Sequence, residues 1–223
     1  MRKRQSQGIM AKRLPEDARK MDDFESELER EYRRRRSNFL PWEARDSKSK
    51  QEQLKYQDVL RRNAGANAFG ENCFISTDAH IYTHRFSIGR NSYIAAGAIL
   101  RGDIKIGSNS TVNPFAHLAG TVVIGDGVRI SGLVAIYGFN HGFDRLDIPI
   151  YQQETTSRGV VINDGTWIGT HVAIIDGIEV GAHCILAAGS VITKNVPDYA
   201  IVGGNPARVL RNRRDTSNLR TET

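Results

Sequence analysis

Residues 162–192 read INDGTWIGTHVAIIDGIEVGAHCILAAGSVI, and in this stretch an aliphatic residue stands at every sixth position. An α-helix repeats every 3.6 residues and a β-strand every two, so neither explains a period of six. A hexapeptide period is typical of a parallel β-helix, in which short strands stack coil upon coil. The repeated positions, called anchors below, are Ile162, Ile168, Ile174, Val180, Leu186 and Ile192.

The same period runs through an earlier part of the chain without a slip. Glycine, asparagine and aspartate follow many of its anchors, and these residues tolerate the backbone angles of a tight corner. We therefore predict a mainly β protein with a parallel β-helix over residues 67–198 and the anchors in its core. A single extra residue interrupts the spacing between Ile81 and Ile88. The earlier anchors are Ile88, Ile94, Leu100, Ile106, Val112, Leu118, Ile124, Ile130 and Ile136.

The N-terminal part lacks this period. Residues 1–13 are polar and basic and are predicted to be a disordered tail. Residues 14–66 are predicted to form a helical segment, with one helix from Pro15 to about Arg36 and a second beginning at Ser47 or Ser49. We expect these helices to lean on the first coil and shield the open end of the β-helix.

Charge and cysteine content narrow the possible function classes. The formal net charge is +6, and much of the basic excess lies in residues 1–36. Acidic residues alternate with the basic ones there and no aromatic residues do, which favours a solvated helix over a nucleic-acid or membrane arm.

Cys73 and Cys184 lie far apart and neither belongs to a CxxC pair, which argues against a disulfide framework and a zinc ribbon. The chain also has no signal-peptide core and no membrane-spanning run, so a cytoplasmic protein is expected.

Between Ile136 and Ile162 the aliphatic period fails for 26 residues, which is not a multiple of six. We predict that a loop at about residues 138–160 leaves the β-helix here. Long loops on a rigid scaffold often carry function. This one holds His141 close to Asp144, so it is where the chemistry is expected.

The loop and the later coils resemble the hexapeptide-repeat acyltransferases, left-handed β-helix enzymes that move acetyl groups from acetyl-CoA. The similarity covers about residues 70–213 and is greatest to sugar and polysaccharide O-acetyltransferases of the maltose and galactoside type. It implies a left-handed winding, which runs against the usual right-handed crossover. The motifs that carry it are Asn140-His141-Gly142-Phe143-Asp144, Pro149-Ile150, residues 162–169, residues 187–194 and Gly204-Asn205-Pro206-Ala207-Arg208-Val209.

The resemblance implies that His141 is the general base of a direct acetyl transfer to a hydroxyl group. An imidazole is suited to this because its ordinary pKa of about 6.5 lies near neutral pH. Asp144 or a backbone carbonyl could hold the other ring nitrogen. Family members also place an asparagine against the acceptor, and Asn113 is the nearest candidate, although a corner asparagine is almost as good an interpretation.

Acetyl-CoA is the implied co-substrate, and no metal is expected. The resemblance also implies a small-molecule or glycan acceptor and a homotrimer with active sites between adjacent subunits. Residues 199–223 would then form the C-terminal segment on the CoA side. Small side chains would line the pantetheine arm, and cations would meet the phosphates. The residues that match family CoA positions, or a tryptophan beside the active site, are Trp167, Thr170, Ala188, Thr193, Lys194, Arg208 and Arg211.

Three other interpretations stay open. The acceptor could be the amine of an amino sugar or antibiotic, or the β-helix could be a non-catalytic scaffold. A zinc carbonic anhydrase of the same architecture would need three histidines. His80, His84 and His117 are available, but the close pair comes first in the chain instead of last.

Overall fold

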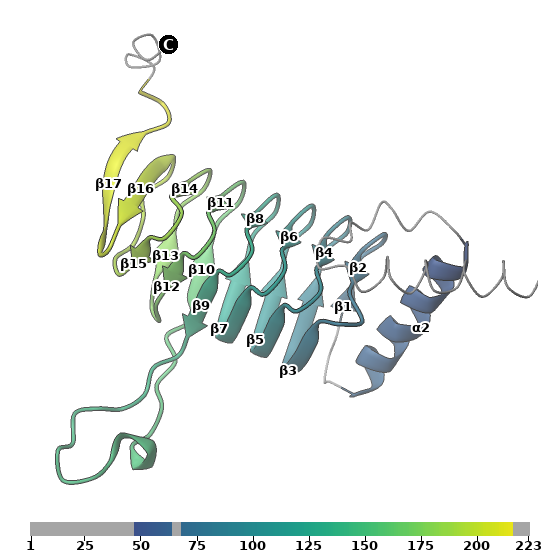
Figure 1. Ribbon diagram of the computed structural model, residues 1–223, viewed down its shortest axis with the longest axis horizontal. Coiled ribbons are helices and arrows are strands. Elements are labelled where there is room, and N and C mark those ends of the chain that lie inside the picture. The colour runs from purple at the N-terminus through teal and green to yellow at the C-terminus, as the bar shows by residue number, and fades with distance from the viewer. Residues whose placement is uncertain (1–46, 64–67, 216–223) are drawn as a thin grey trace, which may run out of the picture. The chain divides into compact units, whose positions relative to one another are not determined.

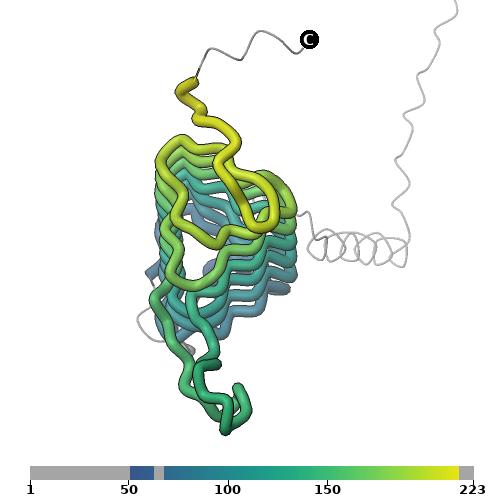
Figure 2. The backbone as a smooth tube through the Cα atoms, turned by 90° about the vertical axis from the view of Figure 1, so that its left-hand side faces the viewer, coloured from purple at the N-terminus to yellow at the C-terminus, as the bar shows by residue number. Residues whose placement is uncertain are grey.

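The computed structural model describes residues 47–63 and 68–215, and within that part the chain winds into a prism of stacked coils (Figure 1). The tail expected over residues 1–13 and the helix expected up to Arg36 lie outside the described residues. Viewed along the prism in Figure 2, successive coils follow nearly the same path, as a hexapeptide period requires.

The strands lie in two sheets of nine and eight strands, which run along the length of the prism. The first sheet contains β1 (Ala68–Phe69), β3 (His80–Ile88), β5 (Ile99–Ile106), β7 (His117–Ile124), β9 (Ala135–Gly138), β10 (Val160–Ile162), β12 (Ala173–Ile174), β13 (Glu179–Val180) and β15 (Val191–Ile192). The second contains β2 (Phe74–Ile75), β4 (Tyr93–Ile94), β6 (Thr111–Val112), β8 (Arg129–Ile130), β11 (Trp167–Ile168), β14 (Ile185–Leu186), β16 (Ala200–Gly204) and β17 (Ala207–Asn212).

The anchors form the core as the period predicts. Each pairs with the equivalent residue of the next coil, as in Leu100 with Leu118 and Leu118 with Ile136. All fifteen anchors are at most 2% exposed. Burying one such aliphatic side chain stabilises a fold by about 1.5–3 kcal/mol, so the column of anchors is the main source of stability.

The single extra residue before Ile88 is absorbed as a bulge. In the pairing of β3 with β5, the register shifts between Thr83 and Arg85, which leaves His84 without an opposite residue. The winding resumes in phase after it, because the insertion is confined to one corner.

One corner of the prism shows how the turn residues are chosen. Asn72, Asn91 and Asn109 all have a φ between +54° and +57°. Their side-chain amides are linked from coil to coil, by hydrogen bonds of 2.9 Å and 3.3 Å. Asparagine suits this corner because it tolerates a left-handed backbone and its amide can bond to the same residue one coil away.

Helix α2 (Ser47–Asn63) packs against the first coil. The side-chain amide of Gln53 donates to the Ile75 carbonyl and its oxygen accepts from the Ile75 N–H, both at 2.8 Å. The buried Gln57 amide donates to the Cys73 carbonyl at 3.1 Å. These peptide groups face away from the next coil, so the two glutamines take the place of a missing neighbouring strand.

At the other end, the winding continues beyond residue 198, so the predicted boundary is wrong there. Val196 bridges Val180, and β16 pairs in parallel with β14. The prediction failed because this coil is two residues shorter than the others, which hides Val196 and Val202 from a strict six-residue count. Strand β17 then folds back antiparallel on β16 and covers its edge.

Candidate active site

The predicted loop leaves the prism between β9 and β10 (Figure 1). Gly138 pairs with Gly120, and Val160 pairs with Val122. Residues 139–158 are therefore inserted where the preceding coil passes directly from Gly120 to Thr121. The insertion does not disturb the scaffold, since Ala173 still pairs with Ala135 in the next rung.

The two legs of the loop are bonded to each other. Asn140 and Thr156 form an antiparallel bridge, with N–H to carbonyl distances of 2.7 Å and 2.9 Å. Farther out, the Gly142 N–H donates to the Glu154 carbonyl at 3.0 Å. A short 3-10 helix at Ile150–Gln152 forms part of the outer loop. The loop is thus an ordered hairpin rather than an irregular excursion.

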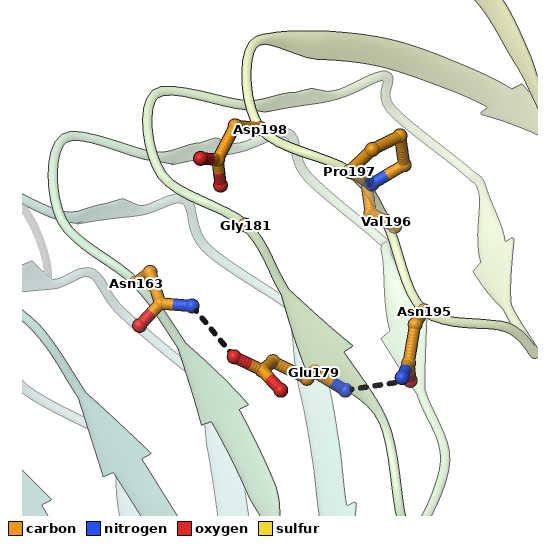
Figure 3. A pocket seen from close by; sticks show the side chains of 7 residues that line it. All are labelled: Asn163, Glu179, Gly181, Asn195, Val196, Pro197 and Asp198. Carbon is orange, nitrogen blue, oxygen red and sulfur yellow. Dashed lines mark hydrogen bonds between the residues drawn. The ribbon is translucent and has the colours of Figure 1, made fainter.

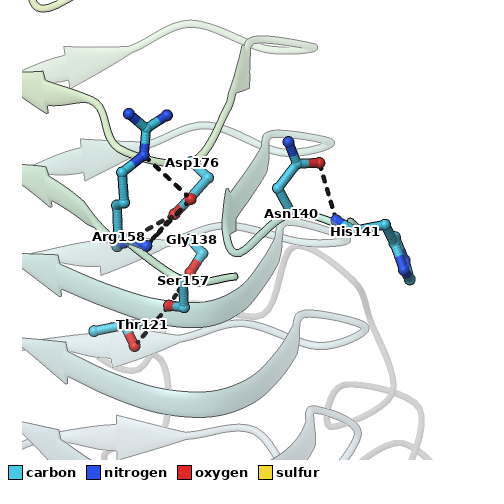
Figure 4. Close-up of polar contacts among 8 residues, drawn as sticks. Thr121, Gly138, Asn140, His141, Ser157, Arg158 and Asp176 are labelled. Carbon is cyan, nitrogen blue, oxygen red and sulfur yellow. Dashed lines mark hydrogen bonds and ion pairs between the residues drawn. The ribbon is translucent and has the colours of Figure 1, made fainter. Parts of the chain in front are cut away.

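The root of the loop is fixed to the prism (Figure 4). The Ser157 hydroxyl donates to the Gly138 carbonyl at 2.6 Å, which ties the returning leg to the outgoing one. The carboxylate of Asp176, which is only 5% exposed, accepts the backbone N–H groups of Arg158 and Gly159. Both legs therefore start from defined positions.

His141 is exposed, and in Figure 4 it lies on the far side of Asn140 from Ser157 and Asp176. Its backbone N–H donates to the Asn140 side-chain oxygen at 3.0 Å. The Phe139 and His141 ring centroids are 5.9 Å apart, the Tyr137 and Phe139 centroids 6.1 Å apart, and the His117 and Tyr137 centroids 5.1 Å apart, all edge to face. A row of four rings thus runs from the scaffold to the predicted base.

At the scaffold end of this row, the His117 ring nitrogen Nδ1 is 3.0 Å from the Tyr137 hydroxyl. Burial lowers the pKa of His117 below its ordinary value of 6.5, and the nearby positive charge of Arg101 lowers it further. Both effects disfavour the charged imidazolium, so His117 is neutral near pH 7.

The single chain does not bring the other two predicted catalytic residues to His141. Asp144 is exposed, and in residues 68–215 no hydrogen bond joins it to the His141 ring. Asn113 lies at the corner between β6 and β7, where its amide donates to the Ile130 carbonyl at 2.7 Å. Its oxygen accepts from the Tyr93 hydroxyl at 2.9 Å. In this chain Asn113 thus makes the bonds of a corner asparagine.

The residues matched to CoA positions lie toward the C-terminal end of the prism. Thr170 and Ala188 are exposed at one corner of adjacent coils, linked by a hydrogen bond from the Gly189 N–H to the Thr170 carbonyl at 2.9 Å. Trp167 on β11 is 53% exposed. Thr193 follows β15 and is half-buried. The cationic side chains of this set, all exposed, are Lys194, Arg208 and Arg211.

Part of the CoA set lies at a different corner from the loop, whereas Thr193 and Lys194 follow β15 at the corner from which the loop leaves, in the column of Gly138 and Asp176. Thr170 lies between β11 and β12, whereas the loop with His141 leaves between β9 and β10. One chain therefore presents the small residues Thr170 and Ala188 at one corner, and the imidazole on a projecting hairpin at another.

Comparisons with known proteins agree with this geometry. The family model described as bacterial transferase hexapeptide (six repeats) matches residues 103–138 and 159–194, which are the coils on either side of the loop. The chain is 30% identical over 149 residues to a protein of Escherichia coli K12 named as a putative lipopolysaccharide biosynthesis O-acetyl transferase, covering 62% of this chain and 75% of that protein. The chain belongs to the hexapeptide-repeat acyltransferases.

A second relative is also named as an O-acetyltransferase. Galactoside O-acetyltransferase of Escherichia coli K12 is 28% identical over 148 residues, covering 64% of this chain and 62% of that protein. Against the first curated relatives that it matches, the chain spans between 42% and 75% of the relative's length.

Among solved structures, this acyltransferase is similar to AntD, an N-acyltransferase from Bacillus cereus. A mutant of AntD in complex with dTDP-4-amino-4,6-dideoxyglucose and coenzyme A has a TM-score of 0.62 and 25% identity. The match covers 71% of this chain and 89% of AntD. The similarity confirms the predicted fold class, a left-handed parallel β-helix.

A hollow that the sequence did not predict lies near the end of the β10–β13 face (Figure 3). It has a volume of about 330 Å³ and carries the polar side chains Asn163, Glu179, Asn195 and Asp198. Two hydrogen bonds within it join Asn163 to Glu179 at 3.2 Å and the Glu179 N–H to Asn195 at 3.0 Å. None of the residues predicted for catalysis or CoA binding lines it.

The described residues contain neither a metal-ligand cluster nor a membrane-spanning helix. Within residues 47–63 and 68–215, no three His, Cys, Asp or Glu side chains gather as a metal site. Of the three histidines considered for zinc, His80 stacks on Tyr82 at 6.2 Å and His117 bonds to Tyr137. No helix in the described part of the chain combines the length and apolar character needed to cross a membrane.

Sequence reasoning missed the residues that hold the loop. Asp176 stands where the three preceding coils have glycine, at Gly102, Gly120 and Gly138. A carboxylate that follows three glycines at the equivalent position, in the first coil after the insertion, could have indicated a contact with the loop. The contact of Ser157 with Gly138 left no such signal, since it joins two positions of a hairpin whose pairing the sequence does not reveal.

Proposed function

We propose that this protein transfers an acetyl group from acetyl-CoA to a hydroxyl of a sugar or glycan precursor, with His141 as the general base. The observation that carries the proposal is the ordered hairpin, which presents one imidazole from a rigid hexapeptide scaffold. The O-acetyltransferases among the relatives support the choice of a hydroxyl.

The transfer needs no covalent enzyme intermediate. The His141 ring nitrogen takes the proton of the acceptor hydroxyl as its oxygen attacks the thioester carbon. Backbone N–H groups at a coil corner stabilise the oxyanion of the tetrahedral species. As that species collapses, the carbon–sulfur bond breaks, the CoA thiolate leaves and the imidazolium returns its proton to sulfur. Asn113 is proposed to face the acceptor, and Asp144 or a carbonyl to orient the imidazole.

The chain offers a fitting surface for CoA. Thr170 and Ala188 expose only small side chains at their corner, which leaves room for the pantetheine arm beside Trp167. Thr193 and the cations Lys194, Arg208 and Arg211 follow toward the adenosine end. Guanidinium and ammonium groups suit the pyrophosphate and the 3′-phosphate, since charge-assisted hydrogen bonds to phosphate are the strong ones.

Because Thr170 and Ala188 lie at a different corner from His141, we propose that a neighbouring copy completes each site in a homotrimer. His141 of one subunit would then act beside CoA bound partly by the next. We also propose a cytoplasmic location, where acetyl-CoA is available as co-substrate.

N-acylation is the second candidate, favoured by one observation. The AntD structure pairs an N-acyltransferase of the same fold with an amino sugar nucleotide and coenzyme A. A neutral imidazole could equally take a proton from an attacking amine, so the geometry alone does not choose between the two acceptors.

The test is a matched pair of acceptors, dTDP-6-deoxyglucose and dTDP-4-amino-4,6-dideoxyglucose, each incubated with acetyl-CoA and analysed by mass spectrometry. We expect an ester product from the hydroxyl acceptor. The same assay is then extended to a panel of further sugars. Product from the amine alone would favour N-acylation. No product from any acceptor, with no shift of the melting temperature at millimolar CoA, would favour a scaffold, because a ligand that binds the native state must stabilise it.

A further inference from the structure

The root of the loop contains a buried carboxylate that the proposed chemistry does not use. Asp176 is 5% exposed. Its two oxygens lie 3.0 Å and 3.1 Å from the Arg158 backbone nitrogen, and Oδ1 lies 2.8 Å from that of Gly159 (Figure 4). Burying a carboxylate is costly unless it is well bonded, so this arrangement calls for an explanation.

The interruption of the coil supplies the reason. Along this corner the preceding coils carry Gly102, Gly120 and Gly138, whose backbones lie against one another without side chains. The returning chain brings two successive backbone N–H groups, those of Arg158 and Gly159, to this corner. The Asp176 carboxylate accepts both, and an ionised acceptor makes a stronger hydrogen bond than a neutral one.

Further contacts connect this carboxylate to both legs of the hairpin. The Arg158 guanidinium Nε lies 3.7 Å from Asp176 Oδ2, and its plane covers Gly177, where a Cβ would approach within 2.7 Å. One residue earlier, the Ser157 hydroxyl bonds to the Gly138 carbonyl on the outgoing leg. Beyond that, the Asn140–Thr156 bridge leads to His141.

We propose that Asp176 is a positioning residue for His141, which fixes the returning leg and thereby the place at which the hairpin presents its imidazole. This inference rests on the proposed role of His141. A misplacement of about 1 Å can lower a rate by about 100-fold, so a loosened root is expected to lower turnover although Asp176 touches neither substrate.

The experiment compares Asp176→Asn with Asp126→Asn in the full chain. Asp126 is a fair control because its Oδ1 also accepts a backbone N–H, that of Ser108 at 2.6 Å, at a different corner. Hydrogen exchange by mass spectrometry is followed in peptides covering residues 139–159. In parallel, kcat and KM are measured with acetyl-CoA and the best acceptor of the panel above.

For Asp176→Asn we expect exchange in residues 139–159 to accelerate about 10-fold or more. We expect kcat to fall about 10- to 100-fold, with the KM for acetyl-CoA within about twofold of wild type. Asp126→Asn should leave both readouts near wild type. Ser157→Ala, which removes the hydroxyl link between the legs, should shift both in the same direction as Asp176→Asn, and it guards against a variant that fails to fold.

Wild-type exchange in the loop of Asp176→Asn would overturn the proposal, and so would an unchanged kcat. His141→Ala is assayed alongside to separate the two claims. If His141→Ala is inactive while Asp176→Asn turns over normally, only the positioning role falls. If His141→Ala itself keeps wild-type turnover, the base assignment falls, and the effect of Asp176 on catalysis falls with it.

Discussion

The anchors of the prism and the outer part of the loop differ in the exposure of their apolar side chains. Every anchor of the prism is at most 2% exposed, whereas on the loop Leu146 is 97% exposed, Tyr151 80% and Phe143 62%. The prism is stabilised by burial, and the loop by directed hydrogen bonds at its root and between its legs. We therefore expect stability and the proposed function to be carried by different residues, as when a rigid scaffold supports a functional loop.

The largest effect is expected from a substitution of His141, which should abolish the proposed function of the loop and leave the stability of the prism unchanged. Replacing it by glutamine should lower acetyl transfer about 10²- to 10⁴-fold, since that is the usual contribution of a general base. The melting temperature should stay within a degree or two of wild type, about the shift expected for an exposed side chain. Both quantities are measured on the same preparation.

His84→Gln is the matched control, because His84 is also exposed but lies in the bulge of β3. Its turnover should equal that of wild type. Near-normal turnover in His141→Gln would show that the loop carries no base, and the comparison would then reduce to a scaffold with an ordered appendage.

A pair of truncations to alanine measures the contrast in stability directly. Ile130→Ala removes a fully buried anchor and should lower the free energy of unfolding by about 2–5 kcal/mol. Leu146→Ala removes an exposed leucine and should change it by less than about 0.5 kcal/mol. Urea denaturation followed by circular dichroism gives both values. Equal losses would mean that another chain covers the loop under the conditions of the assay.

The cations of the C-terminal end provide a test of intermediate size. Lys194→Ala and Arg208→Ala should each raise the KM for acetyl-CoA about 10-fold, the loss expected for one charged hydrogen bond. Turnover at saturating acetyl-CoA should change much less. Acetyl-dephospho-CoA separates the phosphates, because a variant that has lost the 3′-phosphate contact should no longer distinguish it from acetyl-CoA. An unchanged KM in both variants would remove these residues from the CoA site.

The smallest expected effect concerns His117, at the scaffold end of the ring row. Its pKa is lowered in the fold, so the folded state binds a proton less readily than the unfolded chain. The stabilisation is therefore full above the ordinary pKa near 6.5 and is lost as the pH falls through the lowered value. Arg101→Gln should raise this pKa, measured by NMR titration of the ring protons. A pKa that stays unchanged would leave burial as the whole cause.

The fold could be read from the sequence because its cause is local and repeated. Each anchor needs only to be aliphatic and six residues from the next, and a register fixed in one coil is copied into the following ones. The same rule failed between Val180 and Val196, where a shortened coil kept its apolar residues but lost the spacing. A six-residue period therefore identifies coils of regular length and misses a shortened coil.

The site was less accessible to the same reasoning. The absence of the period located the loop, and a motif singled out His141. The glycine column pointed to Asp176 as an exceptional residue, but nothing in the sequence told which groups of the loop it bonds. Asp176 is close to the root in space and well beyond the loop in sequence, so the contact exists only once the coils are stacked. The arrangement of Thr170 and His141 at different corners likewise follows from winding, which residue types do not encode.

The chain leaves the prism after Gly138 and re-enters at Gly159 on the same rung, so the coils above are wound as if nothing had been inserted. The register of the coils on either side does not depend on the number of residues in the inserted hairpin. The hairpin is in this sense a self-contained insertion, held at its root by the hydrogen bonds of Asp176 and Ser157. The length of the hairpin can therefore change without altering the register of the coils, whereas the position of His141 depends on the bonds at the root.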